Sequence, residues 1–86
     1  MHYVYILLLR NKQLYTGTTA DLKRRTDEHK QGKVASTAKR RPVELIHYEA
    51  YLLKSDAGRR ERYLKTTEGK RLLRQQLKDL LDTLGK

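Results

Sequence analysis

The sequence predicts an α/β fold in which a small three-stranded antiparallel or mixed sheet is flanked by helices, in the order β-β-α-β-α-α. The first half of the chain alternates apolar, β-branched or aromatic runs with polar turns, as strands do, whereas the last third carries leucines at helical spacing. The 86 residues are the size of one domain, which we take as 1–86. A domain this small buries only roughly 60% of its unfolded surface, so its core is thin.

The first two strands are expected to form a hairpin. Residues 3–9 are apolar throughout and predict a central strand, and residues 14–17 return as a short second strand after a polar turn. Tyr5 and Tyr15 lie on its two arms. Because side chains alternate across a sheet, a loop of three or five residues puts both tyrosines on one face, and a loop of two or four separates them.

A helix is expected to follow the hairpin. Thr18, with Asp21 three residues later, resembles a capping box, so the helix should run from about residue 20 to 31. Gly32 is the expected C-terminal stop. Residues 33–41 are small, polar and basic, which predicts a loop.

The second half of the chain predicts one more strand and two helices. Residues 43–52 alternate imperfectly and form the third strand. Ser55 and Asp56 are expected to cap a helix that ends near residue 66, and a last helix should span 68–84. Its apolar stripe, at helical spacing, is expected to be core: Leu73, Leu77, Leu80, Leu81 and Leu84.

The charge predicts a polyanionic partner. Lys and Arg number 20 against 10 acidic residues, a formal charge of +10, and residues 1–42 hold ten of the basic residues but only three of the acidic ones. Such an excess attracts nucleic acid. The densest basic clusters are candidates for phosphate contacts: Lys23, Arg24, Lys39, Arg40 and Arg41. A solvated basic surface without a partner is the plain alternative.

Composition excludes several classes of protein. The chain has no cysteine, so disulfides, thiolate zinc sites and thiol nucleophiles are absent. Its longest apolar run, 3–9, is too short to span a bilayer and is not flanked like a secretory signal. We therefore expect a cytoplasmic protein without a membrane or disulfide partner. The sequence leaves the oligomeric state open.

Glu61 is the candidate acid. Ala57, Glu61 and Leu64 share one face of their predicted helix, so this carboxylate is expected to point toward the sheet. A buried carboxylate needs a cation. That cation is either a basic side chain, Lys65 one turn later or a nearby arginine, or a divalent metal ion, and the spacing alone leaves these open.

Arg25 and His29 are a second candidate pair. They lie four residues apart on one helix face, with Asp21 one turn earlier. An exposed Asp21–Arg25 ion pair would contribute little. Alternatively, Arg25 clamps a phosphate through its planar donors and His29 supplies a hydrogen bond or proton. Gly17, just before that helix, either allows a ligand to approach the backbone closely or only eases the bend, and the Thr18 hydroxyl at the helix N-terminus is a candidate anion contact.

The order of these residues resembles the GIY-YIG nuclease superfamily, and more closely its small stand-alone bacterial branch. The resemblance rests on Val4-Tyr5-Ile6, Tyr15-Thr16-Gly17, Arg25, His29 and Glu61, in that order and spacing. It covers residues 3 to about 65. Val4 stands where the first signature has glycine, Thr16 where the second has an aliphatic residue, and Thr18 where some relatives have lysine.

The resemblance implies an endonuclease that cuts a DNA phosphodiester with Mg²⁺ or Mn²⁺, an activity that suits roles such as DNA repair. It makes Tyr5, Tyr15, Arg25, His29 and Glu61 catalytic, with Glu61 as the metal ligand. Tyr5 would be the base and Tyr15 its orienter. A tyrosine is a poor base at neutral pH, so Arg25 and the metal are expected to lower the pKa of Tyr5.

Two other functions fit the composition. The first is a catalytically inactive basic module that only binds nucleic acid, which would have no need to keep the five residues together. The second is a protein-interaction domain that uses the terminal leucine stripe. The nuclease interpretation requires that the five side chains converge on one pocket beside the sheet.

Overall fold

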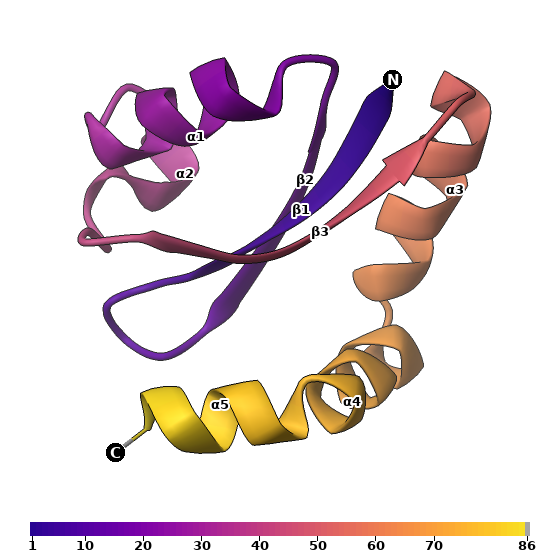
Figure 1. The fold of residues 1–86 in the computed structure, drawn as a ribbon. Coiled ribbons are helices and arrows are strands. Elements are labelled where there is room, and N and C mark those ends of the chain that lie inside the picture. Colours follow the sequence, from indigo (N-terminus) through magenta and orange to yellow (C-terminus); the bar gives the residue numbers. More distant parts are fainter. Residues whose placement is uncertain (86) are drawn as a thin grey trace.

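The computed structural model describes residues 1–85. Three strands, β1 (His2–Leu8), β2 (Leu14–Thr19) and β3 (Glu44–Tyr51), form one sheet in the order β2-β1-β3. Both neighbouring pairs are antiparallel, and β1 is the central strand, as predicted (Figure 1). Its apolar character follows from this position, since helices cover both faces of the sheet.

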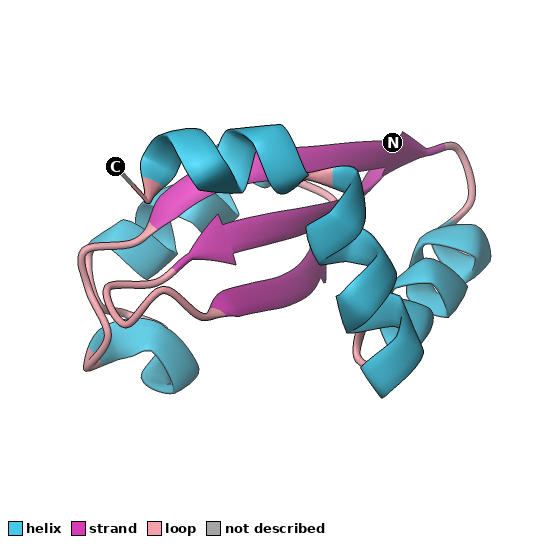
Figure 2. Ribbon diagram, turned by 90° about the horizontal axis from the view of Figure 1, so that it is seen from below, coloured by secondary structure: helices cyan, strands magenta, loops and turns pink. Residues whose placement is uncertain are grey.

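The helices lie in two groups on opposite faces of the sheet (Figures 1 and 2). On one side are α1 (Leu22–Lys30) and α2 (Ala35–Ala38). On the other are the following three: α3 (Lys54–Leu64), α4 (Thr67–Gln76) and α5 (Lys78–Leu84). The predicted α/β class is confirmed. Within residues 1–85, no helix is both long and apolar enough to cross a membrane.

The alternation of side chains along β1 divides the core into two layers. Val4 and Ile6 face α3 and α4, where they pack against Ala57, Leu64 and Leu73. The intervening residues of β1 face α1 and α2, where the second cluster consists of Tyr5, Leu7, Leu9 and Val43. The central strand thus sends a tyrosine, rather than another aliphatic residue, into the layer beneath α1.

A bulge explains the imperfect alternation of β3. The pairing of β1 with β3 shifts register between Ile6, opposite His47, and Leu7, opposite Leu45. The extra residue, Ile46, packs with the α3 layer, whereas Leu45 packs with Tyr5 and Leu7. The inserted residue therefore puts Ile46 and its neighbour His47, which lies opposite Ile6, on the same side of the sheet and keeps Leu45 opposite Leu7 in the other layer.

Helix boundaries differ from those predicted. Asp21, not Thr18, caps α1, and its Oδ1 accepts the backbone N–H of Arg24 at 3.0 Å. α3 begins at Lys54 without a side-chain cap, so the cap predicted at Ser55 and Asp56 is wrong. Gly32 has φ 78° and ends α1 as predicted, since the left-handed region suits glycine.

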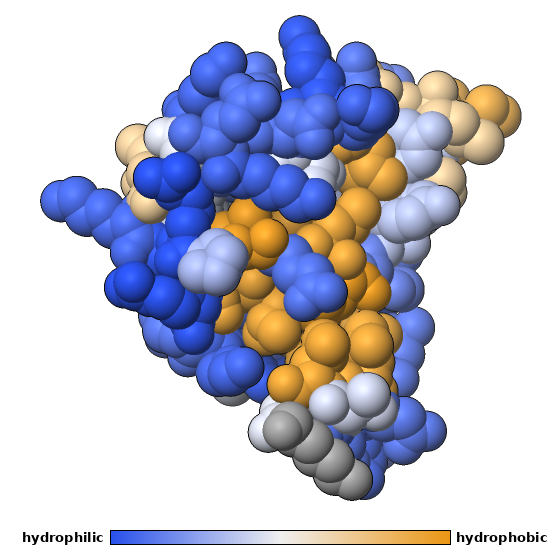
Figure 3. Space-filling model, turned by 60° about the vertical axis from the view of Figure 1, so that its left-hand side comes forward, coloured by the Kyte–Doolittle hydropathy of each residue, from blue (hydrophilic) through white to orange (hydrophobic). Residues whose placement is uncertain are grey.

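The predicted last helix is two helices. The backbone leaves helical geometry at Leu77 (φ −99°, ψ 20°), which separates α4 from α5. Of the leucine stripe only Leu73 is buried, and the remaining four leucines are half-buried. Figure 3 shows the resulting apolar surface continuing over the lower part of the molecule, where α4 and α5 lie. The expectation that the whole stripe is core is therefore wrong.

A half-buried carboxylate ties α3 to β3. Glu49 accepts two hydrogen bonds from the Arg60 guanidinium, at 2.9 and 3.2 Å, and one from the Tyr51 hydroxyl at 2.7 Å. His47 Nε2 lies 3.2 Å from the same carboxylate. Burial alone raises the pKa of Glu49, but these partners outweigh it and hold the pKa at about 2.

This cluster predicts a specific acid sensitivity. The folded-state pKa of Glu49 lies below its unfolded value of 4.5, so its contribution to stability is present above pH 4.5 and is lost as the pH falls toward 2. The shift corresponds to up to about 3 kcal/mol. Denaturant titrations across this pH range should show Glu49→Gln less stable than wild type near neutral pH, with the difference shrinking on acidification. A difference independent of pH would contradict the assignment.

Candidate active site

Tyr5 and Tyr15 lie on the same face of the hairpin. The loop between β1 and β2 has five residues, 9–13, one of the two lengths that bring the tyrosines together. Tyr15 pairs with Leu7, the residue two positions along β1 from Tyr5. The two ring centroids are 6.4 Å apart at an interplanar angle of 37°.

His29 completes a cluster of three rings. It lies in the last turn of α1 and has no exposed surface. Its Nε2 is 2.8 Å from the Tyr5 hydroxyl, and its ring meets Tyr5 and Tyr15 edge-on, with centroids 5.6 and 5.1 Å away. The last turn of α1 thus places an imidazole within hydrogen-bond distance of the Tyr5 hydroxyl.

Helix α2 contributes two residues that the sequence analysis missed. Thr37 is fully buried, and its Oγ1 lies 2.8 Å from His29 Nδ1. Ser36 Oγ donates to the Tyr15 hydroxyl at 3.4 Å. The segment 33–41, expected to be a loop, therefore holds a helical turn that contacts both the tyrosine and the histidine. The adjacent Ser-Thr pair was the available signal, although nothing in the sequence placed it beside the hairpin.

Arg25 lies one turn before His29, beside the Tyr5 hydroxyl. That contact raises the pKa of the Arg25 guanidinium. Its acidic partner is Glu28, at 3.2 Å, and not Asp21. Asp21 caps α1 and lies 3.9 Å from Arg24, so the alternative of an Asp21–Arg25 pair is wrong. Arg25 keeps about a third of its side chain exposed (37%), which leaves its guanidinium accessible.

Burial sets the protonation of the cluster. Burial raises the pKa of the Tyr5 phenol, and Arg25, which lowers it, offsets only part of that effect. Arg25 alone therefore does not depress the pKa of Tyr5, and the expected lowering by Arg25 together with a bound metal ion stays a prediction. Burial also lowers the pKa of His29, and the positive charge of Arg25 adds to the effect. At neutral pH the pair is a neutral phenol hydrogen-bonded to a neutral imidazole.

Gly17 is required by the position of Tyr5. The two residues pair directly across β1 and β2, and the Tyr5 ring lies over the glycine. A Cβ at Gly17 would overlap the Tyr5 hydroxyl and lie 2.5 Å from Tyr5 Cζ. Gly17 is buried in this contact, and its role is to make room for the Tyr5 ring. The expectation that Gly17 lets a ligand approach the backbone is therefore wrong.

Glu61 lines a neighbouring cleft. The cleft, of about 840 Å³, lies between the end of β2 and α3, and its polar lining includes Thr18, Ser55, Glu61 and Arg62. Glu61 Oε2 is 3.2 Å from Lys65 Nζ, so the lysine partner left open by the spacing is the one in contact. The Glu61 charge makes the smallest contribution among those acting on the pKa of Tyr5, which it raises.

A model of the GIY-YIG catalytic domain matches residues 1–75. The chain belongs to the GIY-YIG family. Members of this family are nucleases that act on DNA, which supports a nuclease function here. A UPF0213 protein of Staphylococcus epidermidis is 46% identical over 66 residues, which are 76% of this chain and 80% of that protein.

Two further UPF0213 proteins are similar to this chain. A UPF0213 protein of Haloquadratum walsbyi is 42% identical over 82 residues, which are 92% of each chain. The solution NMR structure of a UPF0213 protein from Bacillus halodurans is 37% identical, with a TM-score of 0.55, and covers 84% of this chain and 80% of that one. At this identity and coverage, the similarity extends beyond the signature residues to the arrangement of the sheet and helices.

The donor set of this GIY-YIG domain is compatible with a hard divalent cation. Among residues 1–85 no three His, Asp or Glu side chains cluster as metal ligands. Glu61 is a single carboxylate with 23% of its side chain exposed to an open cleft. Mg²⁺ characteristically keeps several waters and binds through one or two carboxylates and substrate phosphates, so this site fits it.

Of the five basic residues expected to bind phosphate, four already contact other groups of the protein. Lys23 and Arg24 are exposed but pair with Asp27 and Asp21. The guanidinium groups of Arg40 and Arg41 donate to backbone carbonyls, those of Ser36 and Ala38, and so brace the α2 segment. Thr18, at the cleft, and Lys39 remain exposed.

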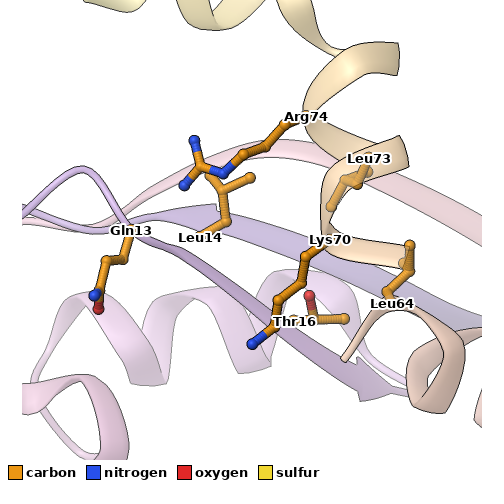
Figure 4. A pocket seen from close by; sticks show the side chains of 7 residues that line it. All are labelled: Gln13, Leu14, Thr16, Leu64, Lys70, Leu73 and Arg74. Atoms are coloured by element: carbon orange, nitrogen blue, oxygen red, sulfur yellow. The ribbon is translucent and has the colours of Figure 1, made fainter. Parts of the chain in front are cut away.

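A second, smaller pocket lies on the face of β2 that is turned away from the three rings. It has a volume of about 290 Å³ and is lined by Leu14 and Thr16 of β2 and by Lys70, Leu73 and Arg74 of α4. Figure 4 shows the long side chains of Lys70 and Arg74 reaching from the helix across the strand. This pocket faces the α3–α4 layer, so it does not share the face of the three rings.

The contact between Gly17 and Tyr5 predicts an unusually costly alanine substitution. Gly17→Ala should push the Tyr5 ring away from His29 and lower the free energy of unfolding by ~1–3 kcal/mol, as overpacking does. Gly58→Ala is the matched control, because a Cβ there meets only the flexible end of Arg62 at 3.5 Å. That variant should be neutral or up to ~1 kcal/mol more stable. Equal melting temperatures for the two variants would contradict the packing described.

Proposed function

We propose that this GIY-YIG domain is a divalent-metal-dependent DNA endonuclease whose reacting groups are Tyr5, His29, Arg25 and Glu61. The observation that carries the proposal is the buried contact between the Tyr5 hydroxyl and His29 Nε2, with Arg25 beside it. A module that only binds nucleic acid gains nothing from burying a phenol against an imidazole. A catalytic site needs such a pair to move a proton.

Tyr5 acts as a proton relay in this proposal. A water molecule attacks phosphorus while its proton passes to the Tyr5 oxygen, and the Tyr5 proton passes to His29 Nε2. The bond from phosphorus to the leaving 3′ oxygen breaks, and that oxygen takes a proton from solvent. Because His29 is neutral before the reaction, its Nε2 can accept the proton, and Tyr5 need not ionise in advance.

Charge on the phosphate is stabilised from two sides. The exposed end of Arg25 supplies planar donors for the non-bridging oxygens. Glu61 would hold the divalent cation, Mg²⁺ or Mn²⁺, and when bound that cation neutralises charge on the phosphate and the leaving oxygen. Tyr15, edge-on to His29 and hydrogen-bonded by Ser36, keeps the ring cluster in place.

The DNA backbone is proposed to follow the cleft at α3. Three basic residues line this cleft: Lys54, Arg59 and Arg62. Arg59 is paired with Asp56 at 2.9 Å. Lys54 and Arg62, which form no ion pair within residues 1–85, are therefore the stronger candidates for phosphate contacts.

Substitution of the charged groups should abolish cleavage without unfolding the protein. We expect Glu61→Gln and Arg25→Ala each to lower the rate of plasmid nicking with Mg²⁺ by ~10²–10³-fold, the usual cost of one group that stabilises transition-state charge. Both side chains are partly exposed, so circular dichroism should remain that of the wild type.

The control for these variants is Arg71→Ala, on the exposed surface of α4, which should cleave like the wild type. Chelation with EDTA should stop cleavage by every variant. If the wild type binds DNA but never cleaves it, with or without Mg²⁺ or Mn²⁺, the catalytically inactive basic module is the correct function.

Binding should depend on the cleft residues. Lys54→Ala and Arg62→Ala should each weaken DNA binding at all sequences and reduce the slope of log K against log salt by ~1, because each removes one phosphate contact. Fluorescence anisotropy over a range of salt concentrations measures this slope. If Lys54→Ala and Arg62→Ala have the same slope of log K against log salt as Arg71→Ala, the DNA binds elsewhere on the protein.

A further inference from the structure

Three buried polar groups form a continuous chain of contacts behind the reacting tyrosine. The Tyr5 hydroxyl is 2.8 Å from His29 Nε2, and His29 Nδ1 is 2.8 Å from Thr37 Oγ1. Thr37 Oγ1 is in turn 3.5 Å from the backbone carbonyl of Val34. The chain starts on β1, passes through α1 and ends on α2.

The direction of these hydrogen bonds follows from counting donors and acceptors. The Tyr5 hydroxyl has one proton, and among its partners within residues 1–85 only His29 Nε2 can accept it. Its other neighbour, the Arg25 guanidinium, is a donor only. If Nε2 carried a proton, the Tyr5 oxygen would face two donors and its own proton would have no acceptor. Nε2 must therefore accept from Tyr5.

The protonation of His29 Nδ1 follows from that of Nε2. His29 is fully buried, and burial lowers its pKa, so the neutral ring carries its single proton on Nδ1. That proton needs an acceptor, and Thr37 Oγ1 is in place at 2.8 Å. The Thr37 hydroxyl can accept because its own proton points to the Val34 carbonyl. This assignment agrees with the rest of residues 1–85, where no buried side-chain nitrogen or oxygen lacks a hydrogen-bond partner.

We infer that Thr37 is a positioning residue that holds His29 in its Nδ1–H tautomer, so that bare Nε2 faces the Tyr5 hydroxyl. In the reaction this role rests on the proposed nuclease function: Nε2 must be free for the Tyr5 proton to leave along the existing hydrogen bond. The resulting imidazolium keeps its Nδ1–H bond to Thr37. The short helix α2 is thus part of the site.

Two substitutions distinguish the effect of the Thr37 hydroxyl from the effect of the shape of its side chain. Thr37→Val keeps the branched side chain and removes the acceptor, whereas Thr37→Ser keeps the hydroxyl. The direct measurement is the ¹⁵N spectrum of the histidine rings in the full chain at neutral pH, in which protonated and bare ring nitrogens have distinct shifts. His2 and His47, which do not contact Thr37, are internal references.

The wild-type spectrum alone decides the first part of the inference. We expect His29 to show a protonated Nδ1 and a bare Nε2, and Thr37→Ser to show the same. Thr37→Val should lose this single tautomer and give a mixture or the Nε2–H form. A wild-type ring protonated on Nε2, or an unchanged tautomer in Thr37→Val, would overturn the inference, and neither result depends on DNA cleavage.

Kinetics test the role of the tautomer in the reaction. Thr37→Val should lower kcat for plasmid nicking by ~10²-fold, within the range of general acid–base effects, with KM unchanged, and Thr37→Ser should restore most of the rate. A tautomer that changes while kcat does not would overturn the positioning role. If the wild type does not cleave at all, the proposed function fails, while the tautomer assignment is still decided by the spectrum.

Discussion

The hydrogen bond between the Tyr5 hydroxyl and His29 Nε2 is the constraint on which the rest of the site depends. A phenol buried on the central strand needs a polar partner, because an unpaired buried hydroxyl costs ~1–3 kcal/mol. Its ring also needs room, which only a glycine opposite provides. The last turn of α1 supplies the partner, Gly17 supplies the room, and α2 closes over the imidazole.

The burial of the site determines the pKa values of Tyr5 and His29. A surface tyrosine beside an arginine would be a candidate phenolate, but burial opposes ionisation of Tyr5 more strongly than Arg25 favours it. The same burial keeps His29 neutral and able to accept a proton. Both shifts keep the pair uncharged before the reaction, so that Tyr5 still carries its proton and one nitrogen of His29 is free to accept one. Arg25 is then available for the phosphate.

The sequence predicted what depends on local pattern. The three strands and the Gly32 stop follow from alternation and turn chemistry, whereas the shared face of Tyr5 and Tyr15 was left open by the sequence and was decided by the five-residue loop of the structure. The helix caps, the break at Leu77 and the contacts of α2 were missed, because each depends on tertiary packing that a sequence pattern does not record. Thr37 is the clearest case, since its function comes from a histidine eight residues away on another helix. The sequence showed the charge of Arg25 but not the burial of Tyr5, which outweighs that charge and raises the pKa of Tyr5.

The most direct test of the account is a crystal structure of the protein with Mn²⁺ and a DNA duplex, with the ion located by its anomalous scattering. The account predicts one ion on the Glu61 carboxylate, a backbone phosphate against the Arg25 guanidinium, and the Tyr5 hydroxyl pointing at that phosphate from its place on His29. DNA bound only along the basic surface, with no phosphate within reach of Tyr5 and no ion on Glu61, would contradict it.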